Sequence, residues 1–400
     1  MEPNLRRLPK ASPDGLVAAV LLSFLATAGF FYVNLMPALI DGLVVGLKFT
    51  ESQAGTVASA NVYGATFGAL LAIPLVRRCD WRKLAVWILL ALLVIDTGSI
   101  FVRDISALIV VRAIDGIIGG VLVGTAFAVI ARTASPDRVF GMLLVVQFGL
   151  GGVGVMYLPR LVPSLGHGVV FAALIGFNLV TLAMLPFLAA YPVKEKTAQN
   201  TALGAPPWRA LILALAAIFL FQAGNMALAA YMIGLGRAFG LAIDFITMTL
   251  GAASWIGAIG SILVIVAGTR LGRFWPVLVA FIPTLLGNAA FHLSASPQVF
   301  FVANVGTAVT WAFIMPYLLG ICASLDKTGR MAALAGFFSH MGLATGPLLG
   351  GLLLAAPDYR LLINAAVAVL CISAAAALVP AFLLDRRSSL KPQTLAETTS

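Results

Sequence analysis

Long stretches without a charged residue limit what this chain can fold into more than any other feature. Gly15–Ile40 and Ser52–Val76 hold no charged side chain, and Phe274–Leu325 continues without one for 52 residues. A helix that crosses a bilayer needs about 20 predominantly apolar residues, so the third stretch has room for two such helices. Charged residues make up only 10% of the chain, against about 25% in soluble domains. We therefore expect lipid, rather than water, to surround most of the protein.

Cutting the sequence at its charged residues, and dividing the long uncharged run in two, gives twelve apolar spans. We place the division of the long run at His292–Gln298, where polar residues and a proline interrupt the apolar pattern. The chain is thus predicted to be an all-α membrane protein with twelve transmembrane helices. Apart from the two in the long run, the predicted spans are Gly15–Ile40, Ser52–Val76, Leu84–Val102, Ile105–Ala131, Val139–Pro159, Leu161–Val193, Ala210–Gly236, Phe245–Thr269, Met331–Pro357 and Leu361–Leu384.

The basic residues give the orientation of these spans. With both ends of the chain inside, 19 of the 25 lysines and arginines fall in cytoplasmic segments, five fall outside, and Arg112 alone lies in the membrane. Lysine and arginine are enriched on the cytoplasmic side of membrane proteins. We therefore expect a multi-pass protein of the bacterial cytoplasmic (inner) membrane with both termini in the cytoplasm. The net charge of +10 is an orientation signal and does not indicate nucleic-acid binding.

A polar stretch, Tyr191–Trp208, separates six spans from six, and the two halves resemble each other. "FLATAG" (Phe24–Gly29) aligns with "FLFQAG" (Phe219–Gly224), and Asp137–Leu144 aligns with Gly329–Gly336 at nearly the same offset. Internal repeats of this kind build many secondary transporters. The predicted parts are a cytoplasmic N-terminal segment (1–14), a six-helix bundle (15–191), a cytoplasmic linker (192–208), a second six-helix bundle (209–385) and a cytoplasmic tail (386–400).

Several motifs add a family resemblance. "RAIDGIIGG" (Arg112–Gly120) places glycines at helical steps after an arginine, Gly68–Lys83 carries a basic cluster between the second and third spans, and Gly342–Gly351 contains a Gly-Pro pair. With the repeat, these motifs resemble the major facilitator superfamily (MFS). The resemblance implies two bundles related by a pseudo-twofold axis around a cavity lined by the first, fourth, seventh and tenth spans. The fifth span has "GLGGVG" (Gly149–Gly154) without the Gly-Pro that accompanies drug/proton antiport in the family.

Polar residues at helical spacing on the cavity-lining spans predict where a solute binds, and two near repeat mates on the fifth and eleventh spans join them. Each of these side chains has an alternative role, because such groups often hydrogen-bond between helices. The otherwise apolar faces favour an amphiphilic or aromatic solute over a sugar. The candidate substrate-binding residues are Thr27, Asn34, Gln147, Gln222, Asn225, Asn304, Thr307, Trp311 and His340.

Arg112 and Asp115 are the charged pair in the fourth span. Each charge costs at least about 2.5–3.5 kcal/mol at mid-depth in a bilayer, so a reason for their presence is needed. Asp115 is predicted to take up a proton, which would release Arg112 to bind a substrate carboxylate or a helix terminus. The family's arginine at this position is associated with proton coupling, although Asp115 is not part of the usual motif. The alternative is a pair that locks two helices together. Asp96 of the third span is expected to pair with a neighbouring helix.

The favoured function is a proton-coupled secondary transporter of a small organic solute, working by alternating access as a monomer, with uptake and export equally compatible. A multidrug efflux antiporter is the alternative, and a membrane-embedded enzyme or sensor is a remote one. Nothing in the sequence resembles a nucleotide-binding motif, and the three histidines and three cysteines are scattered. We therefore expect no enzyme activity, no cofactor and no metal site.

Overall fold

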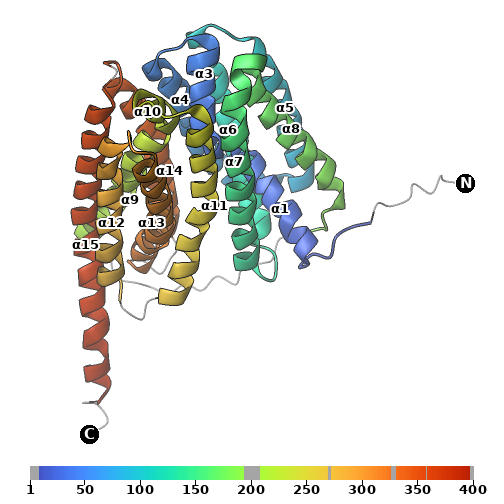
Figure 1. Ribbon diagram of the computed structural model, residues 1–400. Helices are drawn as coiled ribbons and strands as arrows, with labels where there is room; N and C mark the ends of the chain where they lie inside the picture. The colour runs from blue at the N-terminus through green and yellow to red at the C-terminus, as the bar shows by residue number, and fades with distance from the viewer. Residues whose placement is uncertain (1–8, 193–207, 269–271, 326–329, 357, 397–400) are drawn as a thin grey trace, which may run out of the picture. The chain divides into compact units, whose positions relative to one another are not determined.

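The chain divides into two helical units, whose longer helices Figure 1 labels. A computed structural model describes residues 9–192, 208–268, 272–325, 330–356 and 358–396, and no strand occurs among them. Unit 1 comprises Met1–Lys48 and Ala60–Ala198, and unit 2 comprises Phe49–Ser59 and Gln199–Ser400. The predicted linker 192–208 lies, apart from its first and last residues, outside the described residues.

The helices of unit 1 follow the predicted spans closely, except in the first. In this unit α5 packs against α6 and α8, and α1 packs against α6 and α7. Its elements are α1 (Leu16–Ala28), α2 (Phe31–Asn34), α3 (Met36–Leu47), α4 (Glu51–Arg78), α5 (Trp81–Phe101), α6 (Ile105–Ile130), α7 (Pro136–Leu165), α8 (Gly168–Met184) and the 3-10 turn η1 (Leu185–Phe187); α4 begins in unit 2.

The first span is not one helix, contrary to the prediction. It is interrupted after Ala28 and again at Leu35, so that α1, α2 and α3 replace the single helix expected over Gly15–Ile40. Pro37 explains the second interruption, because it lacks the N–H that would bond to the carbonyl four residues earlier. At the first interruption Gly29 lets α6 approach closely, since a Cβ there would collide with the carbonyl oxygen of Gly119.

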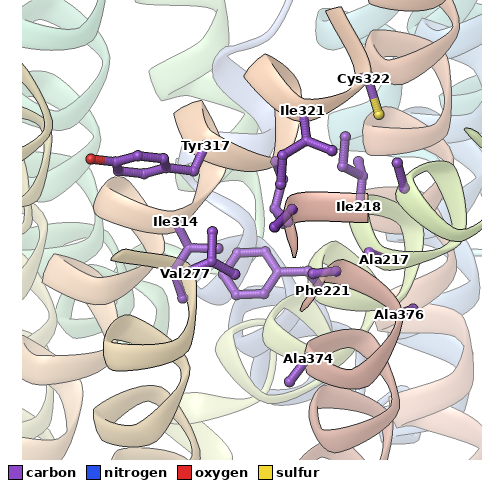
Figure 2. Close-up of a cluster of buried hydrophobic side chains, with 14 of the residues drawn as sticks. Ala217, Ile218, Phe221, Val277, Ile314, Tyr317, Ile321, Cys322, Ala374 and Ala376 are labelled. Atoms are coloured by element: carbon purple, nitrogen blue, oxygen red, sulfur yellow. The ribbon is translucent and has the colours of Figure 1, made fainter. Parts of the chain in front are cut away.

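Unit 2 contains the second set of six spans. Here α9 packs against α14 and α15, and α11 packs against α13. Figure 2 shows part of its core, where Phe221 of α9, Val277 of α12 and Ile314 of α13 come together, all fully buried. Its elements are α9 (Trp208–Ala229), α10 (Met232–Ala238), α11 (Ile243–Ala267), α12 (Phe274–Ala290), the 3-10 turn η2 (Phe291–Leu293), α13 (Pro297–Ser324), α14 (Arg330–Leu353) and α15 (Tyr359–Ala396).

Within the described residues, ten helices are long and apolar enough to cross a membrane. They correspond to ten of the predicted spans. The broken α1–α3 accounts for the first span, and α14 accounts for the eleventh. The prediction of an all-α membrane protein with twelve spans is thus confirmed. The break predicted at His292–Gln298 is also confirmed, because α12 ends at Ala290 and α13 begins at Pro297. The last helix, α15, continues past the predicted end at Leu384 to Ala396.

Asp385 of α15 caps the start of α12. Its carboxylate accepts hydrogen bonds from the backbone N–H groups of Arg273 and Phe274, both at 2.8 Å. The first N–H groups of a helix have no partner within the helix. Replacing Asp385 with alanine is expected to destabilise the protein by about 1–2 kcal/mol, measured as a lower melting temperature of the purified chain. Asp385→Asn, which keeps one acceptor oxygen, is the control and should lose less.

Candidate functional site

Arg112 lies at the centre of a buried charge cluster inside unit 1. Its guanidinium contacts two carboxylates: Nη1 is 3.0 Å from Oδ1 of Asp96 on α5 and 3.4 Å from Oδ2 of Asp115, one turn along α6. Arg112 is 0% exposed, and the two aspartates are 2% and 6% exposed. The expected pair of Arg112 and Asp115 is therefore a triad, and the prediction that Asp96 pairs with a neighbouring helix is confirmed.

Neutral side chains from three other positions complete the hydrogen bonds of the triad. Ser99 of α5 accepts a hydrogen bond from Nη2 of Arg112 at 2.8 Å. Asn178 of α8 donates to Oδ2 of Asp96 at 3.1 Å, and Asn61 of α4 donates to Oδ2 of Asp115 at 2.8 Å. Four helices of the unit thus converge on one charge cluster, and the side chain from α4 bonds the carboxylate of Asp115.

Two aromatic rings cover the guanidinium. The Cζ atom of Arg112 lies 5.2 Å from the ring centroid of Phe171 on α8 and 5.9 Å from that of Tyr32 on α2. Both rings are buried. A cation over an aromatic face is attracted by the quadrupole of the ring, and more strongly when water is absent. The two aromatic rings therefore stabilise the positive charge of Arg112, although they carry no charge themselves.

The two carboxylates are not equivalent. Asp96 has an acceptor bond on each oxygen, one from Arg112 and one from Asn178. Asp115 has a bond only on Oδ2, and its buried Oδ1 has no hydrogen-bond partner among the described residues. An ionised carboxylate in an apolar interior is costly unless it is paired and hydrogen-bonded. Asp96 is thus equipped to remain ionised, whereas Asp115 is the carboxyl that gains most from holding a proton.

Glycines on α6 create the close approach that the cluster needs. A Cβ on Gly116 would collide with the carbonyl oxygen of Asn61, and one on Gly120 would collide with that of Ala65. Both contacts are to α4, so the two helices meet backbone to backbone. This spacing lets the short Asn61 side chain bond both Asp115 and, at 3.2 Å, the carbonyl oxygen of Arg112.

The candidate binding residues of unit 1 lie on three helices. Thr27 is fully buried on α1, and Asn34 is half-buried at the end of α2, beyond the interruption after Ala28. Oγ1 of Thr27 and Nδ2 of Asn34 have no hydrogen-bond partner within the described structure. Gln147 is half-buried on α7. The periodicity predicted for the first span is therefore broken by its own backbone.

In unit 2, three helices join their polar residues in a chain of hydrogen bonds. Trp311 of α13 donates from Nε1 to Oε1 of Gln222 on α9 at 2.8 Å. Gln222 in turn donates from Nε2 to Oγ of Ser339 on α14 at 3.0 Å. Trp311 is half-buried, and the other two are buried. The structure thus brings two of the predicted residues together and adds Ser339, which the sequence reasoning missed.

The remaining candidates of unit 2 bond to their own helices. Asn225, Asn304 and Thr307 each donate to a backbone carbonyl one turn earlier, at 2.8 Å. His340, half-buried on α14, donates from Nδ1 to the carbonyl oxygen of Gly336 at 2.8 Å. Such bonds satisfy a polar group locally while leaving its other donor or acceptor sites for a further partner.

Sequence reasoning missed Asn61, Asn178, Ser99 and Ser339. All four are polar residues in apolar spans, and that composition was the available signal. Spacing along one helix says which residues share its face, but it does not say which face meets which neighbour. The partners of Arg112 and Gln222 therefore emerged only from the packing.

Comparisons with known proteins are consistent with this architecture. The sequence profile of the Major Facilitator Superfamily matches residues 19–323. Among solved structures, the nucleoside transporter NupG superposes with a TM-score of 0.66 at 16% identity, over 92% of this chain and 98% of that one. A D-xylose–proton symporter gives 0.66 at 15% identity, over 91% and 96%.

A bacterial homolog of the human lysosomal transporter Spinster, in an inward-facing and unoccupied conformation, gives a TM-score of 0.66 at 14% identity, over 94% of this chain and 98% of that one. At such identities these similarities show the fold alone. No curated protein sequence matches the chain significantly.

Proposed function

Because the chain belongs to the major facilitator superfamily, we propose that it is a secondary transporter that moves a small organic solute by alternating access and is driven by protons. The solved structures it resembles include transporters of a nucleoside and of D-xylose with a proton. Those names support a small solute as the cargo. The excess of basic residues in the predicted cytoplasmic segments supports cytoplasmic termini. We propose that the protein works as a monomer in a bacterial inner membrane.

The observation that carries proton coupling is the charge balance of the triad. One guanidinium faces two carboxyl groups in a buried site, so the site is neutral only when one carboxyl holds a proton. Buried charges are stable when they are paired and hydrogen-bonded. We assign the proton to Asp115, because Asp96 already accepts two hydrogen bonds.

Arg112 has a different role from the one its sequence position suggested. With Asp115 protonated, Arg112 keeps Asp96 and Ser99 as partners, so it is not released toward a substrate. Arg112 instead holds the permanent counter-charge that makes the proton on Asp115 removable. When Asp115 loses that proton, the cluster carries a net negative charge. Coupling requires such a difference in charge between the protonated and deprotonated states of the protein.

A reconstitution experiment tests this function. The purified chain in proteoliposomes should accumulate at least one compound from a panel of amphiphilic and aromatic metabolites and drugs when a pH gradient is imposed. Dissipating the gradient with a protonophore should abolish the accumulation. Facilitated movement of a solute with no response to the gradient would reject proton coupling, and movement of no solute from a broad panel would reject transport.

Trp311 is predicted to act in solute binding through Gln222. Trp311→Phe keeps an aromatic ring but removes the N–H that bonds Oε1 of Gln222, so it should raise the KM about five- to tenfold, as expected for one lost hydrogen bond. Trp311→Ala should also lose ring contacts and weaken transport further. The predicted role of Asn225 is tested in the same assay by Asn225→Ala. Normal KM values in both alanine variants would place the binding site elsewhere.

A further inference from the structure

A second polar cluster lies in unit 2, at the first turns of α4. The hydroxyl of Tyr231 lies 2.5 Å from the carbonyl oxygen of Pro347 on α14 and 3.2 Å from that of Glu51 on α4. The hydroxyl of Tyr359, at the start of α15, donates to Oε1 of Glu51 at 2.9 Å. Glu51, Tyr231, Pro347 and Tyr359, termed here the α4 latch, thus fasten the beginning of α4 to the rest of unit 2.

Glycines show that this contact is closely fitted. A Cβ on Gly55 of α4 would collide with the hydroxyl of Tyr231. A Cβ on Gly351 of α14 would lie 2.9 Å from the Cα of Ser52, and one on Gly350 would lie 2.8 Å from the ring of Tyr231. The tyrosine ring therefore sits where α4 and α14 have no room for side chains. A displacement of α4 breaks the contact of the Tyr231 hydroxyl with the carbonyl oxygen of Glu51 and leaves its contact with Pro347 of α14.

The α4 latch and the charge cluster are connected by one continuous helix. α4 runs without interruption from Glu51 to Arg78, and its residues pass from unit 2 to unit 1 between Ser59 and Ala60. Asn61, which bonds Asp115, lies ten residues after Glu51 and so ~15 Å along the helix. A shift of α4 at either end is carried to the other, because a helix is stiff over this length.

We infer that Asn61 is a positioning residue that couples the charge of Asp115 to the α4 latch. The inference rests on the proposed function, in which Asp115 gains and loses a proton. A hydrogen bond to an ionised carboxylate is roughly twice as strong as one to a neutral group. Protonation of Asp115 weakens the bond from Asn61, α4 shifts, and its first turns leave Tyr231 and Tyr359.

Three charged or titratable groups of the described residues interact with Asp115. They are Arg112 on its own helix, Asp96 on α5 and the Tyr32 hydroxyl on α2. Coupling is reciprocal between two linked sites. The ionised state of Asp115 favours the closed α4 latch, so weakening the latch should make Asp115 easier to protonate.

The test measures access to α4 in the full chain. Ala54 is fully buried in the latched segment, and Ala54→Cys in a background without Cys79, Cys322 and Cys371 provides a site for a small maleimide. In proteoliposomes, the labelling rate is divided at each pH by that of an exposed cysteine in the same background, because maleimide reacts with the thiolate. This relative rate should rise roughly five- to tenfold as the pH falls, the ratio expected when a charge-assisted hydrogen bond becomes a neutral one. Asp115→Asn should make labelling fast at every pH.

Two amide variants separate coupling from general loosening of the cluster. Asn61→Ala should give fast labelling without pH dependence. The matched control is Asn178→Ala, which removes the bond from α8 to Asp96 and should shift the midpoint of the pH response while retaining its rise. Hydrogen exchange of residues 51–59 in the chain with its native alanine provides a second measurement, and Asp115→Asn should accelerate it.

Tyr231→Phe tests the reverse direction. It removes the hydroxyl from the α4 latch but keeps the ring, and should move the midpoint of the labelling response to higher pH. Unchanged maleimide labelling and hydrogen exchange in Asp115→Asn, or an unmoved midpoint in Tyr231→Phe, would overturn the inference. The proposed function would stand in that case as long as the parent chain still accumulates solute when driven by protons. Accumulation that ignores Asp115 altogether would instead overturn the proposed proton site.

Discussion

Arg112→Ala is expected to abolish both solute accumulation and solute exchange and to lower the free energy of unfolding by about 3–5 kcal/mol, the usual cost of removing one partner from a buried ion pair. The reason is that Asp96 and Asp115 would face each other in an apolar interior with no cation, since Arg112 is the cation within 4 Å of both. Thermal unfolding of the purified protein and transport in proteoliposomes measure the two effects.

Two further variants separate the effect on charge from the effect on folding. Arg103→Ala removes an exposed arginine just before α6 and should change neither stability nor transport by a measurable amount. The double variant Arg112→Met, Asp96→Asn removes both members of the tightest pair and should recover most of the stability without recovering transport. A single Arg112→Ala variant as stable as the parent chain would contradict the buried triad as the source of its stability.

Asp115→Asn is expected to abolish proton-driven accumulation while solute exchange continues. Asparagine has nearly the shape of a protonated aspartate and can still accept a hydrogen bond from Asn61, so the fold should tolerate it. It cannot release a proton, however, and the cluster would remain in its neutral state. Counterflow of labelled solute at equal pH on both sides measures exchange, and uptake under an imposed pH gradient measures accumulation.

The pH dependence gives this prediction a second readout. Transport by the parent chain should depend on pH through Asp115, whereas exchange by Asp115→Asn should be nearly independent of pH. Asp104→Asn is the matched control, because Asp104 is an exposed aspartate at the start of the same helix, and its pH profile should equal that of the parent. Accumulation by Asp115→Asn with an unchanged pH profile would mean that the triad is structural and that coupling occurs elsewhere.

The charge cluster shows how far sequence reasoning reaches. The presence of Arg112, Asp115 and Asp96 in apolar spans already required a partner for each, because an unpaired charge in lipid is too costly to persist. That Arg112 pairs most closely with Asp96 was not deducible, since the two lie 16 residues apart on different helices. Their meeting depends on how α5 and α6 are rotated against each other.

The first span shows the opposite case. Its sequence pattern predicted one continuous helix, but tertiary contacts and a proline interrupt that helix. The candidates Thr27 and Asn34, together with Ser23 and Asp41, recur at steps of four and seven residues, a spacing that is typical of one face of an unbroken helix. Pro37 and the close contact of Gly29 with Gly119 interrupt the backbone, so the residues lie on three short helices. Periodicity assumes an unbroken helix, and tertiary contacts decided that this one is broken.

The sequence by itself determined the solvent, the number of spans and the division into two halves. These follow from transfer free energies that each residue contributes independently of its neighbours, so they can be read along the chain. The tertiary structure decided which polar groups meet: Asp96 with Arg112, Asn61 with Asp115, and Tyr231 with the start of α4. Such pairs depend on the rotation and close approach of helices, which are set by the packing of all the side chains together rather than by the residues that form the pairs.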